Sequence, residues 1–293
     1  MNYLLVSIGQ IPRYMNECIK NIKKIDSESS VYVITDSTDK VQDAKKIDYK
    51  TICSAQTKKI KSLNIYKNTS YEKNPLWINS LLRIFLLKDI VEHYQLEDNI
   101  HFDSDVLIYQ KFDNVCENFK KDKFNITKLA SDRLIFGYSY FKNFEVIDKV
   151  CNEISNYLEK EISKDQWVNN PKNEMQILSA LDNRLFNFLP SYPEGSSEYI
   201  FDGATYGQIV GGTHSRPRRY APLRVYKKGL HDNRLKNLPR GGWLDTSHDL
   251  TEKFLNDKSR IQFIDKTPYL IKDGKKYKIV NLHIHSKELH RFI

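Results

Sequence analysis

Two carboxylates placed two residues apart are the side chains best suited to chemistry in this sequence. Asp103 and Asp105 lie in the stretch NIHFDSDVLIY, residues 99–109, between short runs where apolar and polar residues alternate. Alternation is typical of a β-strand, and side chains at i and i+2 of an extended chain point the same way, so we expect both carboxylates to leave one sheet edge together. Adjacent like charges repel, and carboxylate oxygens suit Mg²⁺ or Mn²⁺, so the pair indicates a metal site. The alternative interpretation is an ordinary turn, since Asp and Ser are frequent turn residues.

Near the end of the chain, the Asp273-Gly274 dipeptide lies between two strand-like runs and predicts a hairpin turn. Two histidines follow in the stretch NLHIHSK, residues 281–287. His283 and His285 alternate with apolar residues, so a strand would project both imidazoles from one face. Neutral imidazole is a good Mn²⁺ ligand and would complete a shell of carboxylate and phosphate oxygens. Ser286 could donate a hydrogen bond, and Lys287 could supply a positive charge, to a departing diphosphate. The alternative is a pair of partly exposed histidines without a function.

The beginning of the chain indicates the sheet that must position these groups. A parallel sheet binds ligands at the carboxyl ends of its strands, where Ser7, Gly9 and Asp36 would contact a nucleotide. No glycine-rich dinucleotide or P-loop pattern is present, so any α/β protein could begin in this way. The predicted elements are a strand over residues 3–8, a helix over residues 12–24 and a second strand over residues 31–35.

A second helix leads directly into the two carboxylates. Apolar residues at i, i+4 spacing predict a helix from Leu76 to Tyr94 that is buried over much of its circumference, with Arg83 among them. A buried guanidinium must be paired. Arg83 therefore forms a structural ion pair, or it orients the carboxylates or meets a diphosphate. The polar segment 38–73 is predicted to be a connection with one strand, Tyr49–Ile52.

Composition sets the remaining bounds. The 293 residues are 40% hydrophobic, enough for a full core, and the net charge of +9 favours an anionic partner. Four scattered cysteines indicate neither a zinc site nor a disulfide framework. The start resembles no signal peptide and no run of 18 apolar residues occurs, so we expect a cytoplasmic protein without a transmembrane segment. The basic segment 214–240 favours contact with an anionic surface; nucleic acid is the less favoured partner because no nucleic-acid-binding motif accompanies it.

Four motifs, in order along the chain, resemble the metal-dependent glycosyltransferases of the GT-A fold with a D-x-D motif. They are an internal helix arginine followed by DSDV, the strand LIFGYSYFKN with Gly137, the acidic motif Asn173-Glu174-Met175, and NLHIHSK. The resemblance implies an α/β fold, a GT-A (Rossmann-like) mixed sheet flanked by helices. It also implies a single domain, with residues 1–110 as the nucleotide-sugar-binding half and residues 111–293 as the acceptor-binding half. Gly137 would lie where a side chain would obstruct the donor.

The resemblance also implies an activity: hexosyl or deoxyhexosyl transfer from a nucleoside-diphosphate sugar, most often a UDP-sugar, to a hydroxyl of a glycan or similar acceptor, with Mn²⁺ or Mg²⁺. Glu174 is the favoured base, because a carboxylate at a helix start stays ionised without a raised pKa. Asp202, in a glycine-rich loop, is the second candidate, and Asp132 is expected to touch the donor sugar. Inversion is favoured, while retention, a basic nucleic-acid-binding protein and a sugar-nucleotide-binding module without turnover stay as alternatives.

Overall fold

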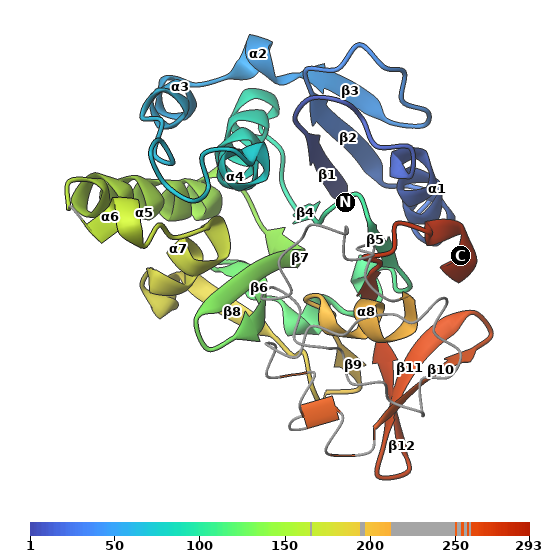
Figure 1. Cartoon of the computed structure of the whole chain (residues 1–293). Coiled ribbons are helices and arrows are strands. Elements are labelled where there is room, and N and C mark those ends of the chain that lie inside the picture. The colour runs from blue at the N-terminus through green and yellow to red at the C-terminus, as the bar shows by residue number, and fades with distance from the viewer. Residues whose placement is uncertain (165, 194–196, 212–249, 251–252, 255–256, 258) are drawn as a thin grey trace, which may run out of the picture.

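The chain folds around one large sheet with helices on both faces (Figure 1). The computed structural model describes residues 1–164, 166–193, 197–211, 250, 253–254, 257 and 259–293. Its main sheet has seven strands in the order β3-β2-β1-β4-β7-β6-β8. The strands are β1 (Asn2–Ser7), β2 (Ser30–Thr35), β3 (Lys45–Asp48), β4 (Asn99–His101), β6 (Phe124–Ala130), β7 (Arg133–Phe141) and β8 (Phe186–Leu189).

The sheet is mixed, and its parallel half forms the predicted edge. β1 pairs in parallel with β2 and β4, and β2 pairs in parallel with β3, whereas β7 runs antiparallel to both β4 and β6. The order follows a doubly wound nucleotide-binding sheet as far as β4 and departs from it at the antiparallel β7. The predicted fold class, an α/β mixed sheet flanked by helices, is confirmed. The carboxyl ends of β1, β2 and β4 meet at one edge.

Successive residues of the central strands face two separate cores. Tyr3 and Leu5 of β1 pack with α1 (Met15–Ile25) on one face, and Leu4 packs with α4 (Pro75–Tyr94) on the other. Both faces are therefore buried, as expected when helices cover a parallel sheet on each side. The other helices are α2 (Tyr49–Ile52), α3 (Ala55–Ser62), α5 (Phe144–Ile162), α6 (Gln166–Asn169), α7 (Glu174–Ala180) and α8 (Thr205–Gly211), with short 3₁₀ turns η1 (Phe112–Asn114), η2 (Cys116–Asn118), η3 (Asn183–Leu185) and η5 (Leu289–Phe292).

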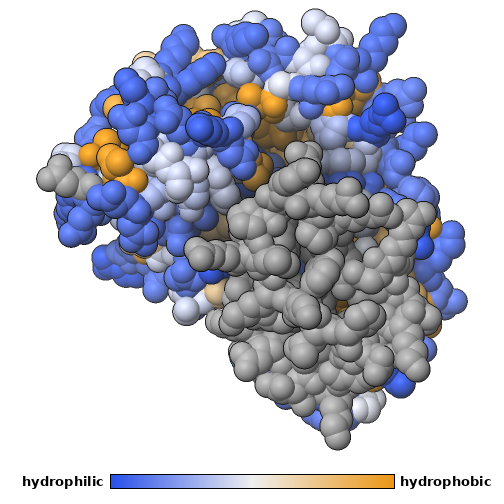
Figure 2. Space-filling model, in the orientation of Figure 1, coloured by the Kyte–Doolittle hydropathy of each residue, from blue (hydrophilic) through white to orange (hydrophobic). Residues whose placement is uncertain are grey.

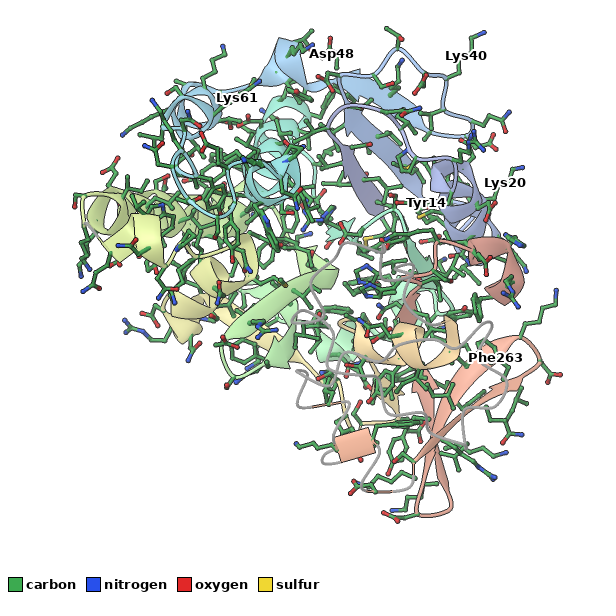
Figure 3. All side chains as sticks on the ribbon, viewed as in Figure 1. Tyr14, Lys20, Lys40, Asp48, Lys61 and Phe263 are labelled. Atoms are coloured by element: carbon green, nitrogen blue, oxygen red, sulfur yellow. The ribbon has the colours of Figure 1, made fainter. Side chains whose placement is uncertain are left out.

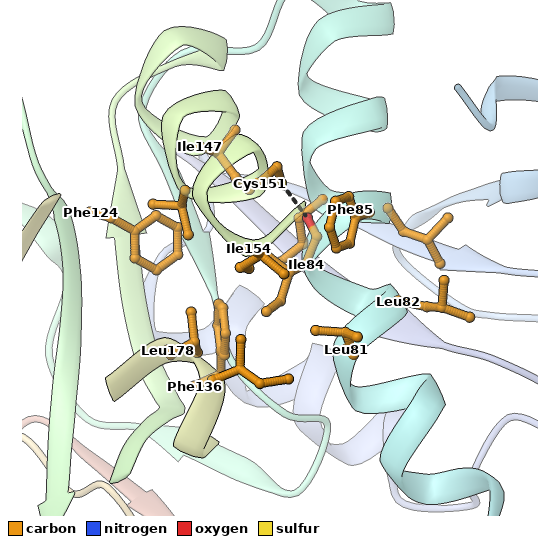
Figure 4. Packing of buried hydrophobic residues seen from close by; sticks show 14 of the residues in the cluster. Leu81, Leu82, Ile84, Phe85, Phe124, Phe136, Ile147, Cys151, Ile154 and Leu178 are labelled. Carbon is orange, nitrogen blue, oxygen red and sulfur yellow. Dashed lines mark hydrogen bonds between the residues drawn. The ribbon is translucent and has the colours of Figure 1, made fainter. Parts of the chain in front are cut away.

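Helix α4 is the central support of the second core. Asn74 caps it by accepting a hydrogen bond from the Leu76 N–H, and Pro75 occupies its first turn. Figure 4 shows its buried residues against α5, α7 and β7, with the Cys151 thiol directed at the Ile84 carbonyl oxygen, 3.9 Å away. The predicted helix Leu76–Tyr94 is confirmed to within one residue. Among the described residues, no helix combines the length and apolar character needed to cross a membrane.

The segment between β2 and α4 contains more structure than the sequence predicts. The predicted strand Tyr49–Ile52 is wrong, because these residues form helix α2. The strand lies one step earlier, as β3, where Ile47 pairs with Ile34 of β2. Asp48 ends the strand and caps the helix by accepting a hydrogen bond from the Lys50 N–H at 3.0 Å. The N-cap at Asp48 outweighs the strand preference of Tyr49, Thr51 and Ile52.

Two smaller sheets bring the end of the chain back to the main sheet (Figure 1). A hairpin turns at Asp273-Gly274, both with positive φ, as the sequence predicts for this dipeptide. A two-stranded pair then places the last strand against the segment that follows the two predicted carboxylates. The strands of these sheets are β10 (Arg260–Ile264), β11 (Thr267–Lys272), β12 (Lys275–Ile279) and β9 (Tyr199–Ile200), and then β13 (Asn281–His283) with β5 (Val106–Ile108).

Candidate active site

The two carboxylates lie in a turn, not in a continuous strand. β4 ends at His101 and β5 begins at Val106, and the Val106 N–H donates to the Asp103 carbonyl oxygen at 2.9 Å. The predicted extended geometry of Asp103 and Asp105 is therefore wrong, because the hydrogen bond between Val106 and Asp103 closes a turn between the two strands. The turn still brings the two side chains together, beyond the carboxyl end of β4.

His283 joins these carboxylates through strand pairing. β13 runs antiparallel to β5 with His283 opposite Val106, and the imidazole Nε2 lies 3.2 Å from Oδ2 of Asp105. One ligand atom from each of Asp103, Asp105 and His283 lies within 4.8 Å of the others. Asp105 and His283 are buried, and Asp103 is partly exposed. Two carboxylates and one imidazole are a donor set that suits Mn²⁺ and also accommodates Mg²⁺.

Basic side chains already contact both carboxylates. Arg83 forms an ion pair with Asp103, and Lys287 forms one with Asp105. Burial opposes ionisation of Asp103, but the charges of Arg83, His283, His101 and Lys287 together outweigh it and hold the pKa of Asp103 below its usual value. Burial lowers the pKa of the Lys287 ammonium to about 8, although the nearby Asp103 charge opposes this shift. The carboxylate pair is therefore stabilised in its charged form by two neighbouring cations.

Glu174 lies on the other side of Arg83. It is the first residue of α7, which Asn173 caps, and its Oε1 accepts a hydrogen bond from Arg83 Nη2 at 2.9 Å. Its side chain is 5% exposed, and this burial raises the pKa of Glu174 despite the opposing Arg83 charge. The expectation that Glu174 needs no raised pKa is wrong, because the helix start is covered by protein. Arg83 thus bridges Asp103 and Glu174.

The carboxylate of Asp202 accepts hydrogen bonds from three backbone N–H groups. Its oxygens accept hydrogen bonds from the N–H groups of Tyr206 at 2.9 Å, Gly207 at 2.8 Å and His283 at 3.0 Å. Burial raises the pKa of Asp202, and the three N–H groups oppose that shift. Asp202 therefore accepts hydrogen bonds from the first turn of α8 and from the backbone of the metal-ligand candidate His283. This arrangement favours a positioning role for Asp202 over its predicted alternative role as a base.

Two glycines allow the segments around Asp202 to approach closely. A Cβ on Gly207 would lie 1.9 Å from the His283 carbonyl oxygen, and one on Gly137 would lie 2.3 Å from the Gly203 carbonyl oxygen. Gly137 is thus required by the loop that crosses it, in place of the predicted clearance for a donor. Asn281 links the same segments, because its amide donates to the carbonyl oxygens of Gly137 and Asp202.

Asn281 is a residue of the site for which the sequence predicts no role of its own. Its amide is fully buried and also accepts from the Asp202 N–H at 3.1 Å. A polar residue between two apolar neighbours, two positions before a candidate ligand, was the available signal. Burial of an amide requires that its hydrogen bonds be satisfied, so this residue fixes the geometry of the segments it joins.

The predicted nucleotide residues lie at the ends of β1 and β2. The Gly9 N–H donates to Asp36 at 2.8 Å, and the Tyr49 hydroxyl donates to the same carboxylate at 3.1 Å. The hydrogen bond from Gly9 is the main reason why the pKa of Asp36 is lowered. The Ser7 hydroxyl lies 3.4 Å from the Gln10 carbonyl oxygen in the same turn. These contacts shape the loop after β1.

A pocket of about 420 Å³ adjoins this loop. It has an apolar side formed by Ile8 and two leucines of α4, and hydrophobic surface shows in the hollow between α4 and β1 (Figure 2). Its rim is basic, and Figure 3 labels one of the contributing lysines, Lys61, at the end of α3. Asn79 of α4 also lines it, one helical turn before Arg83. The residues around the pocket are Ile8, Asp36, Tyr49, Lys50, Cys53, Thr57, Lys58, Lys61, Asn79, Leu82 and Leu86.

Three predicted residues have other neighbours. The His285 ring stacks on His283 with centroids 4.3 Å apart, and its Nε2 lies 3.4 Å from Gln208. The Ser286 hydroxyl is buried without a hydrogen-bond partner among the described residues, so its donor is available to a ligand. Asp132 lies in the exposed turn between β6 and β7. It precedes Gly137 by five residues, and five residues of a strand span about 16 Å, so the two residues lie far apart along the chain.

The basic segment 214–240 lies outside the described residues. Its predicted contact with an anionic surface stays a prediction. The division of the chain at residue 110 also stays a prediction, as do the cytoplasmic location and the assignment of each site residue to its role.

Comparison with known proteins gives only structural matches. The sequence matches no protein family, and no curated protein is similar enough to be matched. The fold is similar to the apo form of the glycosyltransferase GlyE of Streptococcus pneumoniae TIGR4, with 12% identity and a TM-score of 0.41 over 65% of this chain and 45% of that chain. The matched region is thus less than half of GlyE.

Two further structures show the same degree of likeness. Mouse xyloside xylosyltransferase 1 matches with 10% identity and a TM-score of 0.45, over 71% of this chain and 90% of that chain. The galactosyltransferase LgtC, in complex with donor and acceptor sugar analogs, matches with 9% identity and a TM-score of 0.39, over 87% of this chain and 94% of that chain. These three matched proteins are glycosyltransferases.

Proposed function

We propose that the protein is a metal-dependent glycosyltransferase that moves a sugar from a nucleoside-diphosphate sugar, with a UDP-sugar as the first choice, to a hydroxyl of a glycan or similar acceptor. The observation that carries the proposal is the cluster of Asp103, Asp105 and His283. A pocket also lies at the ends of β1 and β2. A pocket with an apolar side and a basic rim suits a nucleoside that carries phosphates.

The three clustered side chains would hold Mn²⁺ or Mg²⁺. The fit rests on the chemistry of the donors, since hard carboxylate oxygens and one imidazole match these cations better than soft metals. When bound, such a cation acts as a Lewis acid that neutralises the charge of a departing diphosphate. Ser286, whose buried hydroxyl has no hydrogen-bond partner among the described residues, and Lys287, which contacts Asp105, would donate hydrogen bonds to the diphosphate oxygens.

The reaction requires the acceptor hydroxyl to lose a proton as it attacks. In the inverting form, the acceptor oxygen forms a bond to the anomeric carbon while the bond from that carbon to the phosphate oxygen breaks. Glu174 would take the hydroxyl proton, and the nucleoside diphosphate would leave with the bonding electrons. Burial raises the pKa of Glu174, and a carboxylate with a raised pKa is a stronger base than an exposed one.

Arg83 would keep Glu174 in one orientation through its 2.9 Å hydrogen bond. Retention stays the alternative mechanism, in which the product keeps the anomeric configuration of the donor. Proton NMR of the first product formed distinguishes the two mechanisms by the configuration at the anomeric carbon.

The first test is a thermal-shift panel of nucleotide sugars with and without Mn²⁺. A donor present at roughly 100 times its dissociation constant should stabilise the protein by about 2.7 kcal/mol, and EDTA should abolish the shift. The Asp105→Asn variant is the matched control and should show no metal-dependent shift. An equal shift in EDTA and in Mn²⁺ would refute the metal site.

The second test separates an enzyme from a binding module. Release of nucleoside diphosphate is measured with the stabilising donor and a panel of saccharide acceptors, each at matched concentration. Release that depends on an acceptor and on Mn²⁺ supports transfer. Donor binding without release, with water or any acceptor in the panel, would favour a sugar-nucleotide-binding module.

A further inference from the structure

The charges around the metal-ligand candidates are almost balanced by the chain itself. Three carboxylates, those of Asp103, Asp105 and Glu174, face two basic side chains, those of Arg83 and Lys287. The cluster therefore carries a net charge of about −1 when all five groups are ionised, in an environment where interactions between charges are stronger than in water. Such a cluster attracts a bare dication much less than two unpaired carboxylates would.

The two basic side chains differ in how firmly they are held. Arg83 contacts Asp103 on one side and Glu174 on the other, and its guanidinium lies over the Phe136 ring at 5.2 Å. Its side chain is only 12% exposed. Arg83 is thus a fixed part of the fold, and it leaves the second oxygen of Asp103 available.

Lys287 is held by one carboxylate at the surface of the cluster. Its side chain is 30% exposed and belongs to the turn that follows β13. Its ammonium contacts Oδ2 of Asp105, the same oxygen that lies 3.2 Å from Nε2 of His283. A cation bound through that oxygen and His283 would lie against the Lys287 ammonium. Lys287 and a metal ion therefore compete for one atom, and their like charges repel.

In the same position, the Lys287 ammonium also lies near an aromatic ring. Its ammonium lies 5.6 Å from the centre of the Tyr14 ring, before the start of α1, where Figure 3 labels Tyr14. A lysine has four rotatable side-chain bonds, so the ammonium can leave Asp105 without movement of the backbone. A diphosphate bound beside the metal would offer it an anionic partner in exchange for Asp105.

We propose that Lys287 is an internal counter-cation that makes tight metal binding depend on the diphosphate of the donor. Without a diphosphate, Lys287 neutralises Asp105 and weakens metal binding. With a diphosphate, the ammonium moves to the phosphate oxygens and Asp105 becomes available to the metal. The inference rests on the proposed function, since it assumes both the metal site and a diphosphate ligand. By linkage, each ligand must raise the affinity for the other by the same factor.

The experiment measures Mn²⁺ binding by titration calorimetry or by electron paramagnetic resonance of free Mn²⁺, with and without UDP. In the unmodified protein, we expect UDP to tighten Mn²⁺ binding on the order of 100-fold. Lys287→Met, which keeps the length of the side chain and removes the charge, should bind Mn²⁺ alone about 10-fold more tightly. In that variant, the effect of UDP should fall to about 10-fold or less, because both ligands lose their link through Lys287.

Two control variants complete the design. Lys287→Arg keeps the charge and should retain most of the coupling between UDP and Mn²⁺. Lys142→Met removes a lysine of similar exposure, 25%, that pairs with Glu97 and Asp98 at the other end of β4, and it should leave both affinities unchanged. Thermal unfolding of each variant checks that the fold is retained.

The outcomes distinguish this inference from the proposed function. If Lys287→Met binds Mn²⁺ alone no more tightly than the unmodified protein, while UDP still promotes binding, Lys287 is only a phosphate ligand and the inference is wrong. If the unmodified protein binds no Mn²⁺ even with UDP, the metal site itself is wrong, and the inference fails with it. A tighter metal complex in Lys287→Met, with reduced coupling to UDP, supports the proposal.

Discussion

Replacement of Arg83 by Met tests whether the buried ion triad holds the site together. Arg83 lies between Asp103 and Glu174, and its side chain is 12% exposed. Met keeps the apolar stem of the side chain but leaves two carboxylates without their partner. Breaking a buried ion pair in this way typically costs about 3 to 5 kcal/mol of unfolding free energy. Two unit charges about 4 Å apart, at an effective dielectric constant near 20, attract by about 4 kcal/mol, which agrees with this range.

The loss should depend on pH in a defined direction. In the unmodified protein, the Arg83 charge helps to hold the pKa of Asp103 below its usual value, so this carboxylate stabilises the fold above the unfolded pKa, and the contribution is lost as the pH falls. The pKa of Glu174 is raised, so its contribution to stability decreases as the pH rises through the window above its usual value of 4.5. Without Arg83, both carboxyl groups favour the protonated form. The stability difference between the two proteins should therefore be largest near neutral pH and shrink on acidification.

Urea unfolding at about pH 7.5 and about pH 5 measures this difference. The matched control is Arg184→Met, because Arg184 pairs with Asp182 while 89% of its side chain is exposed, and its urea midpoint should stay almost unchanged. The double variant Arg83→Met, Glu174→Gln should recover about 1 to 3 kcal/mol relative to Arg83→Met, since the neutral amide costs less to bury. A double variant no more stable than Arg83→Met, or a loss independent of pH, would refute the proposed triad.

The remaining predictions concern the reaction and its support. Asp105→Asn should abolish Mn²⁺-dependent donor binding, measured by calorimetry, while circular dichroism shows an unchanged fold; near-normal turnover in this variant would exclude the assignment. Glu174→Gln should lower turnover by roughly 10² to 10⁴ with donor affinity nearly constant. Asp202→Asn should instead lower thermal stability and weaken Mn²⁺ binding, because its carboxylate holds the His283 N–H; if it lowers turnover alone, Asp202 is the base. Gly207→Ala should destabilise the protein by about 1 to 3 kcal/mol or more, because its Cβ would lie 1.9 Å from the His283 carbonyl oxygen, and an unchanged urea midpoint would contradict this packing.

Patterns among neighbouring residues of the sequence were enough to predict several elements of the structure. Apolar spacing identified α4 to within one residue, and the Asp273-Gly274 dipeptide identified the hairpin turn. The sequence also identified Asp103 and Asp105 as a carboxylate pair and placed His283 in an alternating strand near the chain's end. Such signals are read from neighbouring residues, because helix and strand periods and turn preferences act over a few positions.

The contacts between these residues follow from the tertiary structure and not from local sequence patterns. Asp105 and His283 are 178 positions apart, and the pairing of β5 with β13 brings them to 3.2 Å. Arg83 and Glu174 are 91 positions apart, and burial between α4 and α7 gives Glu174 its raised pKa. In the sequence, Asp202 is an acidic residue in a glycine-rich loop. Its positioning role follows only from the three backbone N–H groups that donate to its carboxylate. Strand register, burial and charge partners arise from contacts between distant segments, so no local pattern encodes them.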